Sequence, residues 1–292
     1  MELALAVDVG GTKLATGVVD ERGRLLVHRS AATTGAADAE ALFTRVMNLV
    51  DHVLAEAPER PAVCGVGCGG PMARGGEQVS PLNITVWRDF PLPSRLTAAT
   101  GLPTFVDNDA KALALGEGWV GAAAGASDFI AMVVSTGVGG GIVLDGRLLD
   151  GAAGNAGHIG HVIVEPDGRM CGCGARGCLE AEASGTAIAA ITGRPPAEAG
   201  PEVIERTGRM VGRAVASVAN LLDLPLAVVA GSVALGYGQP FFAAAQDELD
   251  ARARLDFSRG ARIRPAGLGD VGPLIGAAAV GWRGLGRPVG LG

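Results

Sequence analysis

Apolar residues along the chain follow two patterns, short continuous runs and longer stretches with helical spacing. The short runs are bounded by glycine and other turn residues, which is typical of buried strands. We expect strands at 3–9, 14–19, 24–30, 62–67, 104–107, 129–135, 142–145 and 226–230. The helical spacing predicts helices at 40–54, 109–120, 203–222 and 274–284. This alternation of strands and helices predicts an α/β protein.

The two halves of the chain begin in the same way. A strand, a glycine-rich turn and a second strand occur near residue 8 and again near residue 136. This repetition predicts a small N-terminal α/β domain at 1–112 and a larger α/β domain at 113–273. The helix at about 274–287 is expected to pack back onto the first domain. Coincidence is the alternative explanation, because the chain has 47 glycines, roughly twice the usual share of about 7%.

Composition excludes several classes of protein. Hydrophobic residues make up 48% of the 292 residues and charged residues 18%, which excludes a disordered chain. A net charge of −6 without a run of Lys or Arg argues against nucleic acid or a membrane as a partner. No apolar stretch is long enough for a membrane span, and the first eight residues do not resemble a signal peptide. We therefore expect a cytoplasmic protein.

The first glycine-rich turn lies in the sequence Asp8-Val-Gly-Gly-Thr-Lys13. Gly10 and Gly11 let backbone N–H groups approach phosphate oxygens, and Thr12 adds a donor. Asp8 is placed where a carboxylate could hold magnesium, and Lys13 adds a positive charge. The spacing differs from that of a Walker A loop, and an ordinary hairpin turn is the alternative.

A second turn of this kind lies at Ser135-Thr-Gly-Val-Gly-Gly-Gly141. Packing alone hardly justifies three successive glycines after the strand-end hydroxyls of Ser135 and Thr136, because each glycine costs backbone entropy. We expect a turn over Thr136–Gly141. Two such loops, one in each half, could grip one polyphosphate together.

Between the two loops lies Asp107-Asn-Asp109, at the end of a predicted strand. Carboxylates and amides at such positions are common in turns, which is the simpler interpretation. The functional interpretation makes one carboxylate the general base for a substrate hydroxyl in phosphoryl transfer.

Two of the four histidines, His158 and His161, precede a cluster of three of the five cysteines. An odd number of cysteines argues against a disulfide framework, and clustered thiols in a cytoplasmic protein favour metal. His161, Cys171, Cys173 and Cys178 supply one imidazole and three thiolates, which suits a closed, structural Zn²⁺ site. Buried free thiols are the alternative, but they leave the spacing unexplained.

Taken in order, these motifs resemble the ROK family, a group of sugar kinases and transcriptional repressors. The motifs are Asp8–Lys13, Asn108-Asp109, Thr136–Gly141, Gly151–His161 and Cys171–Glu180. They cover nearly the whole chain, and the Cys-x-Cys-Gly-x-x-Gly-Cys-x-Glu pattern is highly specific. The resemblance implies the two-domain actin-like (ribonuclease H-like) fold, with ATP and sugar meeting in a cleft between the domains. It also implies a homodimer or homotetramer.

The resemblance assigns roles residue by residue. It makes Asp109 the base that accepts the proton of a sugar 6-hydroxyl, in a magnesium-assisted transfer from ATP. Sugar-binding positions are Gly70, Asn83, Asn108, Asp109, His158, His161 and Glu180. Phosphate positions are Asp8, Gly10, Gly11, Thr12, Lys13, Thr136 and Gly137, and Gly231 and Ser232 flank adenosine. His161 would bind zinc through one ring nitrogen and sugar through the other, so that the metal shapes the sugar pocket.

One position departs from most family kinases, which have Glu where this chain has His158. Bacterial N-acetylmannosamine kinases resemble this chain in reading Ala-Gly-His-Ile-Gly-His, which favours a sugar with an acylamino group at C2. The segment Pro81–Pro91, in contrast, looks like that of actinobacterial glucokinases. We therefore expect a glucokinase-like hexose 6-kinase, with N-acetylmannosamine or another N-acylhexosamine as the alternative substrate. Asp107 and Lys111 are smaller departures, where Glu and Asn are frequent.

A noncatalytic function is the remaining alternative. Repressors of this family carry a helix-turn-helix domain before the first phosphate loop, which here begins at Asp8. A noncatalytic sugar sensor would need neither both phosphate loops nor Asp109. Both alternatives are therefore disfavoured.

Overall fold

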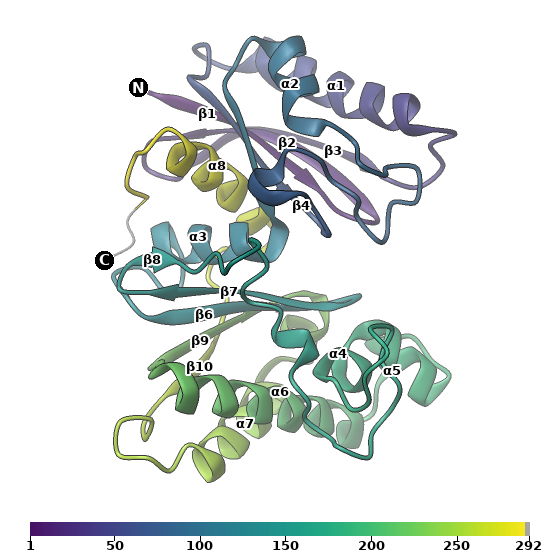
Figure 1. The fold of residues 1–292 in the computed structure, drawn as a ribbon, viewed down its shortest axis with the longest axis vertical. Coiled ribbons are helices and arrows are strands. Elements are labelled where there is room, and N and C mark those ends of the chain that lie inside the picture. The colour runs from purple at the N-terminus through teal and green to yellow at the C-terminus, as the bar shows by residue number, and fades with distance from the viewer. Residues whose placement is uncertain (290–292) are drawn as a thin grey trace. The chain divides into compact units, whose positions relative to one another are not determined.

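The computed structural model describes residues 1–289, which fold into two compact units (Figure 1). Unit 1 contains Met1–Gly125, Asp150–Gly154 and the described chain from Leu268 onward; unit 2 contains Ala126–Leu149 and Asn155–Gly267. The first division falls after residue 125, not near the expected 112. The reason is that α3 (Asp109–Val120) packs along α8 (Gly272–Gly284) inside unit 1.

The sheet of unit 1 has the strand order β3-β2-β1-β4-β5. Its strands are β1 (Leu3–Val9), β2 (Lys13–Asp20), β3 (Leu25–Ala32), β4 (Val63–Cys68) and β5 (Thr104–Asn108). The first three strands form an antiparallel meander, and β4 and β5 run parallel to β1. The carboxyl ends of β1, β4 and β5 therefore lie at one edge of the sheet, where ligands bind in open α/β sheets.

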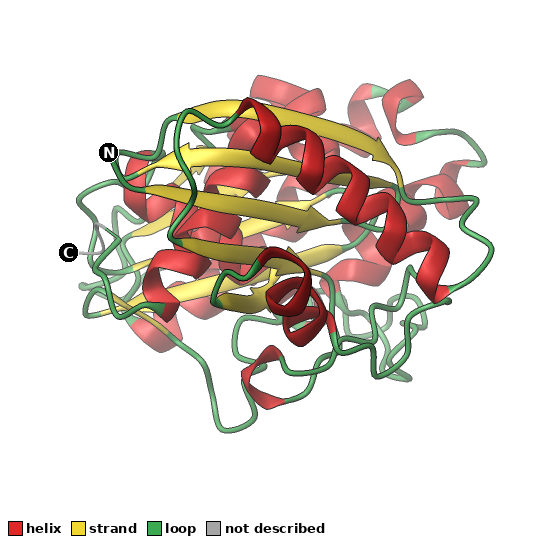
Figure 2. Cartoon of the chain, turned by 90° about the horizontal axis from the view of Figure 1, so that it is seen from above, coloured by secondary structure: helices red, strands yellow, loops and turns green. Residues whose placement is uncertain are grey.

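Helices cover both faces of this sheet. Apolar side chains of α1 (Ala39–Glu56) share a core with alternate residues of β1, and Figure 2 shows the helix lying across the strands. On the other face α8 comes so close to β4 that a Cβ on Gly65 would lie 1.9 Å from the carbonyl oxygen of Ala277. The helix α2 (Leu92–Thr100) follows the proline-rich connection and was not predicted. Two short 3-10 turns lie at Arg74–Gly76 and Gly269–Val271.

The sheet of unit 2 has the order β10-β9-β6-β7-β8. Its strands are β6 (Phe129–Val134), β7 (Val138–Leu144), β8 (Arg147–Leu148), β9 (Leu226–Ala230) and β10 (Arg262–Pro265). Again the first three strands form an antiparallel meander and the last two run parallel to the first. The two sheets thus have the same topology, as the repeated strand, turn and strand in the sequence suggested.

The turn expected at Thr136–Gly141 is shorter in the structure. It is closed by the N–H of Ser135, which donates to the carbonyl of Gly137 at 3.0 Å, and β7 begins at Val138. The three successive glycines therefore lie inside a strand, where a following segment covers them. A Cβ on Gly157 would lie only 2.3 Å from the carbonyl oxygen of Gly140. These glycines permit close packing, which the sequence alone could not distinguish from a turn.

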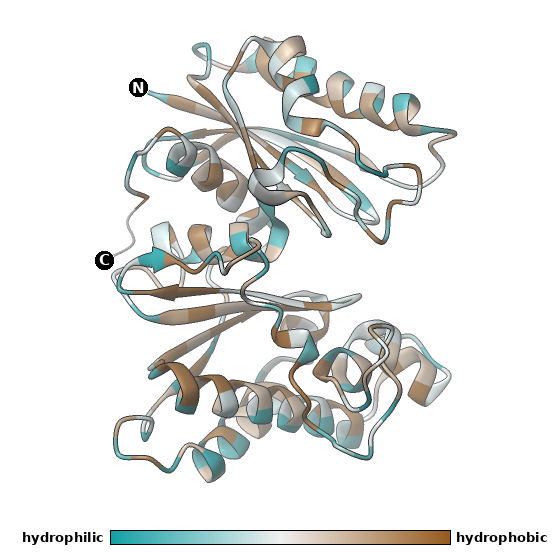
Figure 3. Ribbon diagram, in the orientation of Figure 1, coloured by the Kyte–Doolittle hydropathy of each residue, from teal (hydrophilic) through white to brown (hydrophobic). Residues whose placement is uncertain are grey.

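The helices of unit 2 are α4 (Leu179–Ala183), α5 (Gly185–Thr192), α6 (Pro201–Leu222) and α7 (Ser232–Arg252), with 3-10 turns at Ile159–His161 and Pro196–Glu198. The long helices α6 and α7 pack closely, because a Cβ on Gly208 would lie 2.4 Å from the carbonyl of Phe241. Both helices carry a mixture of hydrophobic and hydrophilic residues (Figure 3). None of the helices in the described residues is long and apolar enough to span a membrane.

Candidate active site

The turn between β1 and β2 carries the first candidate phosphate loop. The N–H of Gly10 donates to the carbonyl of Lys13 at 3.0 Å and closes the turn. Thr33, which the sequence analysis did not single out, braces it: its hydroxyl donates to the carbonyl of Gly10 at 2.6 Å. Thr12 and Lys13 are exposed. The turn is thus held from behind while its tip remains open to a ligand.

Two carboxylates lie beside this turn. Asp8 is the last residue but one of β1 and Asp109 begins α3, and a Cβ on Gly67 would lie 3.7 Å from both Asp8 Oδ1 and Asp109 Cα. Burial, together with the charge of Asp109, raises the pKa of Asp8 to about 7, while Lys13 acts in the opposite direction. A cation bound here would stabilise both charges.

The start of α3 fixes Asn108 and Asp109. The Oδ1 atoms of both side chains accept from the N–H of Ala110, at 3.0 and 2.8 Å. The loop after β4 faces them, because a Cβ on Gly70 would lie 3.6 Å from Asn108 Nδ2 and one on Gly69 3.9 Å from Asp109 Oδ2. Asp109 is exposed. The glycines therefore leave space in front of an amide and a carboxylate that are held in place.

Asn83 lies against the first hairpin. A Cβ on Gly11 would lie 2.7 Å from the Cβ of Asn83, so only glycine fits here without moving the loop. Farther along the same segment, the rings of Trp87 and Phe90 stack with their centroids 4.4 Å apart. Unit 1 thus brings together Asp8, the β1–β2 turn, Gly70, Asn83, Asn108 and Asp109.

The turn between β6 and β7 borders a cavity of about 590 Å³ in unit 2. Its lining comes from the turn, from α5 and the segment after it, and from the starts of α6 and α7: Ser135, Thr136, Gly185, Thr186, Pro195, Pro196, Ala197, Ala199, Ile204, Ser232, Val233, Gly236 and Tyr237. The hydroxyls of Ser135 and Ser232 lie 3.0 Å apart, and Thr186 Oγ1 donates to the carbonyl of Thr136 at 2.9 Å. No local sequence pattern marks Thr186 or Tyr237, because separate segments of the chain bring them here.

Gly231 lets α7 begin at the rim of this cavity. Its φ of +101° favours glycine, and a Cβ there would lie 2.3 Å from the carbonyl oxygen of Val134. Ser232, the first residue of α7, therefore lies beside the turn rather than away from it.

Glu180 is bound directly to the second hairpin. Its Oε2 accepts from the N–H of Val138 at 3.0 Å, and a Cβ on Gly137 would lie 2.9 Å from the same oxygen. A residue expected to bind sugar and a turn expected to bind phosphate thus share one contact.

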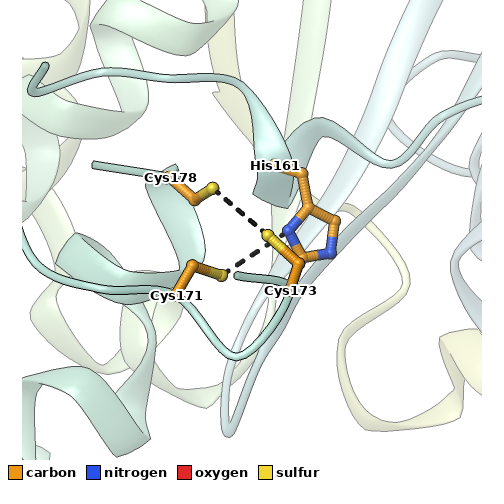
Figure 4. Close-up of side chains that lie close together, drawn as sticks. All are labelled: His161, Cys171, Cys173 and Cys178. Carbon is orange, nitrogen blue, oxygen red and sulfur yellow. Dashed lines mark hydrogen bonds between the residues drawn. The ribbon is translucent and has the colours of Figure 1, made fainter. Parts of the chain in front are cut away.

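The histidine and cysteine cluster forms as the sequence predicts (Figure 4). The ligand atoms of His161, Cys171, Cys173 and Cys178 all lie within 4.8 Å of one another. His161 Nδ1 is 3.7 Å from Cys171 Sγ, and Cys173 Sγ is 3.7 Å from Cys178 Sγ. Ligand atoms of tetrahedral zinc with bonds of about 2.0–2.3 Å lie about 3.5–3.8 Å apart. The cluster therefore has the donor set and spacing of a closed zinc site.

His158 lies next to this cluster. Its ring centroid is 6.0 Å from that of His161, and both residues are exposed. Because His161 directs Nδ1 to the thiols, Nε2 is the nitrogen left for another partner. Unit 2 thus groups His158, His161 and Glu180 near the cysteines, and Thr136, Gly137, Gly231 and Ser232 near the cavity.

Comparison with known proteins decides the family. The sequence matches the ROK family over residues 4–282. The chain belongs to the ROK family. It is 39% identical to the N-acetylmannosamine kinase of Citrobacter koseri over 251 residues, 80% of this chain and 84% of that protein.

Two solved ROK structures resemble this one over almost the whole chain. The glucokinase of Streptomyces griseus, crystallised with glucose and AMPPNP, has a TM-score of 0.83 and 31% identity, covering 96% of this chain and 99% of that one. The ROK hexokinase of Thermus thermophilus has a TM-score of 0.86 and 32% identity, covering 98% and 100%. These similarities confirm the expected actin-like fold.

Proposed function

We propose that this ROK protein transfers the γ-phosphoryl group of ATP to the 6-hydroxyl of a hexose, as a glucokinase-like kinase. The observation that carries the proposal is the grouping in unit 1 of a glycine hairpin with Asp109, Asn108 and Asn83. It combines donors for phosphate oxygens, a carboxylate for a hydroxyl proton and amides for further sugar hydroxyls.

Asp109 would act as the general base. The hydrogen bond from Ala110 N–H fixes one carboxylate oxygen, and the other faces the open loop at Gly69. In this role Asp109 Oδ2 accepts the proton of the 6-hydroxyl as the oxygen attacks phosphorus. Asn108, held by the same N–H, would orient a neighbouring hydroxyl.

The two hairpins would hold the nucleotide. The β1–β2 turn would contact phosphate through Gly10, Gly11, Thr12 and Lys13, and Thr136 and Gly137 would do so from the β6–β7 turn. The cavity bordered by Ser232 has room for adenosine. Magnesium, which Asp8 would help to hold, neutralises charge on the phosphates when bound.

The Cys₃His cluster would hold a structural zinc ion. Four protein ligands leave no open coordination position, so the metal supplies shape and not a reactive water. Through His161 and the short stretch from Cys178 to Glu180, the cluster would hold two sugar-binding side chains in place.

The test is a coupled ADP-release assay with glucose, N-acetylmannosamine, N-acetylglucosamine, mannose and fructose. We expect glucose to give the highest kcat/KM, with glucose 6-phosphate as the product. If no sugar of the panel raised ADP release above the rate without sugar, the proposal would be wrong.

His158 favours N-acetylmannosamine as a second candidate substrate. An imidazole carries no fixed negative charge and accepts fewer hydrogen bonds than the Glu of most family kinases. If N-acetylmannosamine is the substrate, His158→Glu should shift the ratio of kcat/KM values towards glucose by tenfold or more. The same change should leave the ratio unaltered if His158 does not contact the sugar.

A further inference from the structure

Four charged side chains of unit 1 form a closed ring of alternating sign. Lys111 Nζ lies 3.1 Å from Asp107 Oδ1 and 2.7 Å from Asp150 Oδ1. Arg283 closes the ring on the other side, 3.4 Å from Asp107 Oδ2 and 2.9 Å from Asp150 Oδ2. Two of its members, Asp107 and Lys111, are among the positions where the sequence departs from the residues frequent in the family.

Lys111 is the buried member of this ring. Its side chain is 4% exposed, although it is a lysine in the first turn of a helix. A buried ammonium is stable only when it is paired, and removing it would leave Asp107 and Asp150 with Arg283 alone. Burial raises the pKa of Asp150, but the hydrogen bonds from Lys111 and Arg283 outweigh burial. The pKa therefore lies below its ordinary value, and this carboxylate is charged.

Two members of the ring flank the turn that carries the proposed base. Asp107 precedes Asn108 and Asp109, Lys111 follows them, and an ion pair joins Asp107 to Lys111 across this turn. Asp107 Oδ1 also accepts from the N–H of Asn108 at 2.8 Å. The backbone of Asn108 and Asp109 is therefore held on both sides by the same pair of charges.

The ring also holds a separate segment of the chain. Asp150–Gly154 belongs to unit 1, although Leu149 and Asn155 on either side of it belong to unit 2. Asp150 is bound by both cations, and Lys111 Nζ lies 3.4 Å from the carbonyl oxygen of Gly154. This segment continues directly into Asn155–His161, which carries His158 and His161.

We propose that Lys111, with Asp107, Arg283 and Asp150, acts as an electrostatic clamp that sets the positions of two parts of the sugar site. One part is the Asn108-Asp109 turn, and the other is the segment that leads to His158. Lys111 is thus a positioning residue, not a catalytic one. The proposal rests on the proposed function for its effect on turnover, but the anchoring of Asp150–Gly154 does not depend on it.

Hydrogen exchange tests the anchoring without any substrate. Lys111→Met keeps the length of the side chain and removes its charge, and should raise amide exchange in peptides covering 150–161 by about tenfold. Lys111→Arg, which keeps the charge, should restore most of the protection. Asp150→Asn alters a half-exposed member of the ring, so it provides the same test if Lys111→Met does not fold.

Kinetics test the positioning. Lys111→Met and Asp150→Asn should each lower kcat about tenfold and raise the sugar KM, while the ATP KM stays within twofold, because small displacements of reacting groups are costly. If the ring acts as a unit, the double variant should be no worse than the poorer single one.

The control is Arg24→Met. Arg24 pairs with the buried Asp20 at 2.6 Å in unit 1, outside the proposed site. The Arg24→Met variant should have a lower melting temperature, with kcat and amide exchange at 150–161 unchanged. If the ring variants behaved like this control, the clamp would be refuted. If the wild type used no sugar, the proposed function would fail and exchange alone would decide the anchoring.

Discussion

The hairpins β1–β2 and β6–β7 occupy the same place in two sheets of the same topology, but they differ in chemistry. Asp8 lies one residue before the last paired residue of β1, and the corresponding residue of β6 is Val133. The first hairpin thus has a carboxylate of raised pKa and a second carboxylate beside it, whereas the second borders a cavity. The same backbone arrangement therefore has different chemical surroundings in the two units, with the charged groups in the first half.

Each hairpin nevertheless touches one polar side chain of the proposed sugar site. Gly11 meets Asn83, and Gly137 meets Glu180. The first contact involves the Cβ next to the main chain, while the second involves the end of a longer side chain. We infer that the first hairpin constrains its neighbour more tightly than the second.

The largest effect is expected at the carboxylate of the first half. Asp109→Asn removes the proposed base but keeps its shape, so kcat should fall by about 10²–10⁴ while calorimetry shows sugar binding unchanged. Asp145→Asn, in an exposed turn of the second half, should have normal turnover. Near-normal turnover of Asp109→Asn would show that the two halves do not differ as proposed.

The metal cluster distinguishes the second half. Cys173→Ser removes one of four ligands, so the protein should lose its zinc, and its melting temperature should fall by about 10 °C. Metal analysis and thermal melting check this, with Cys64→Ala in β4 as the control that keeps zinc. A Cys173→Ser variant with full zinc, or a wild type without any, would contradict the assignment.

Asp8 should make stability depend on pH. Because its pKa is raised to about 7 in the folded protein, its contribution is present below about pH 4 and is lost as the pH rises through 7. Ionisation costs the folded state up to about 4 kcal/mol. Asp8→Asn should therefore melt about 5 °C higher than the wild type at pH 9 and equally at pH 4. Asp51→Asn, which changes an exposed carboxylate, is the control. If the melting temperatures of Asp8→Asn and the wild type differed by the same amount at pH 4 and pH 9, the assigned role of Asp8 would be wrong.

A pair of alanine substitutions compares the hairpins directly. Gly11→Ala must move Asn83 and its loop, so the sugar KM should rise about tenfold, or about 1.4 kcal/mol. Gly137→Ala displaces only the end of the Glu180 side chain and should raise the sugar KM about threefold. Gly200→Ala, whose Cβ would meet nothing within 4 Å, should change nothing. The reverse order of the two effects would show that the second hairpin is the more constrained.

Strands were predictable where the chain has a continuous apolar run, and motifs were predictable where their residues lie close together in the sequence. β1, β6 and β9 are continuous apolar runs, so their positions follow from the sequence. α7 was missed because Gly238, with φ of +60°, and Pro240 interrupt its helical pattern. β10 was missed because it spans only Arg262–Pro265 at a sheet edge, with a single buried residue, which is too short for its alternation to stand out.

The candidate site was likewise predictable only where its residues lie close together in the sequence. The zinc ligands lie close in sequence and show a pattern, whereas the charge ring does not. Lys111 meets Asp150 across 39 positions, and Asp107 meets Arg283 across 176. Tyr237 lies in the cavity lining because α7 begins beside it at Ser232, directly after Gly231. Such contacts depend on the tertiary fold, and no local pattern carries them.

The discontinuity of unit 1 affects how the protein is made. Its sheet is complete once β5 has been synthesised, but α8, which packs against β4 at Gly65, emerges only after all of unit 2. Unit 1 is therefore the first part of the chain to be synthesised and the last to be completed. The apolar face of its sheet that α8 covers stays exposed until then. A fragment ending at residue 125 should accordingly be prone to aggregation, whereas co-expression with a peptide spanning α8 should keep it in solution.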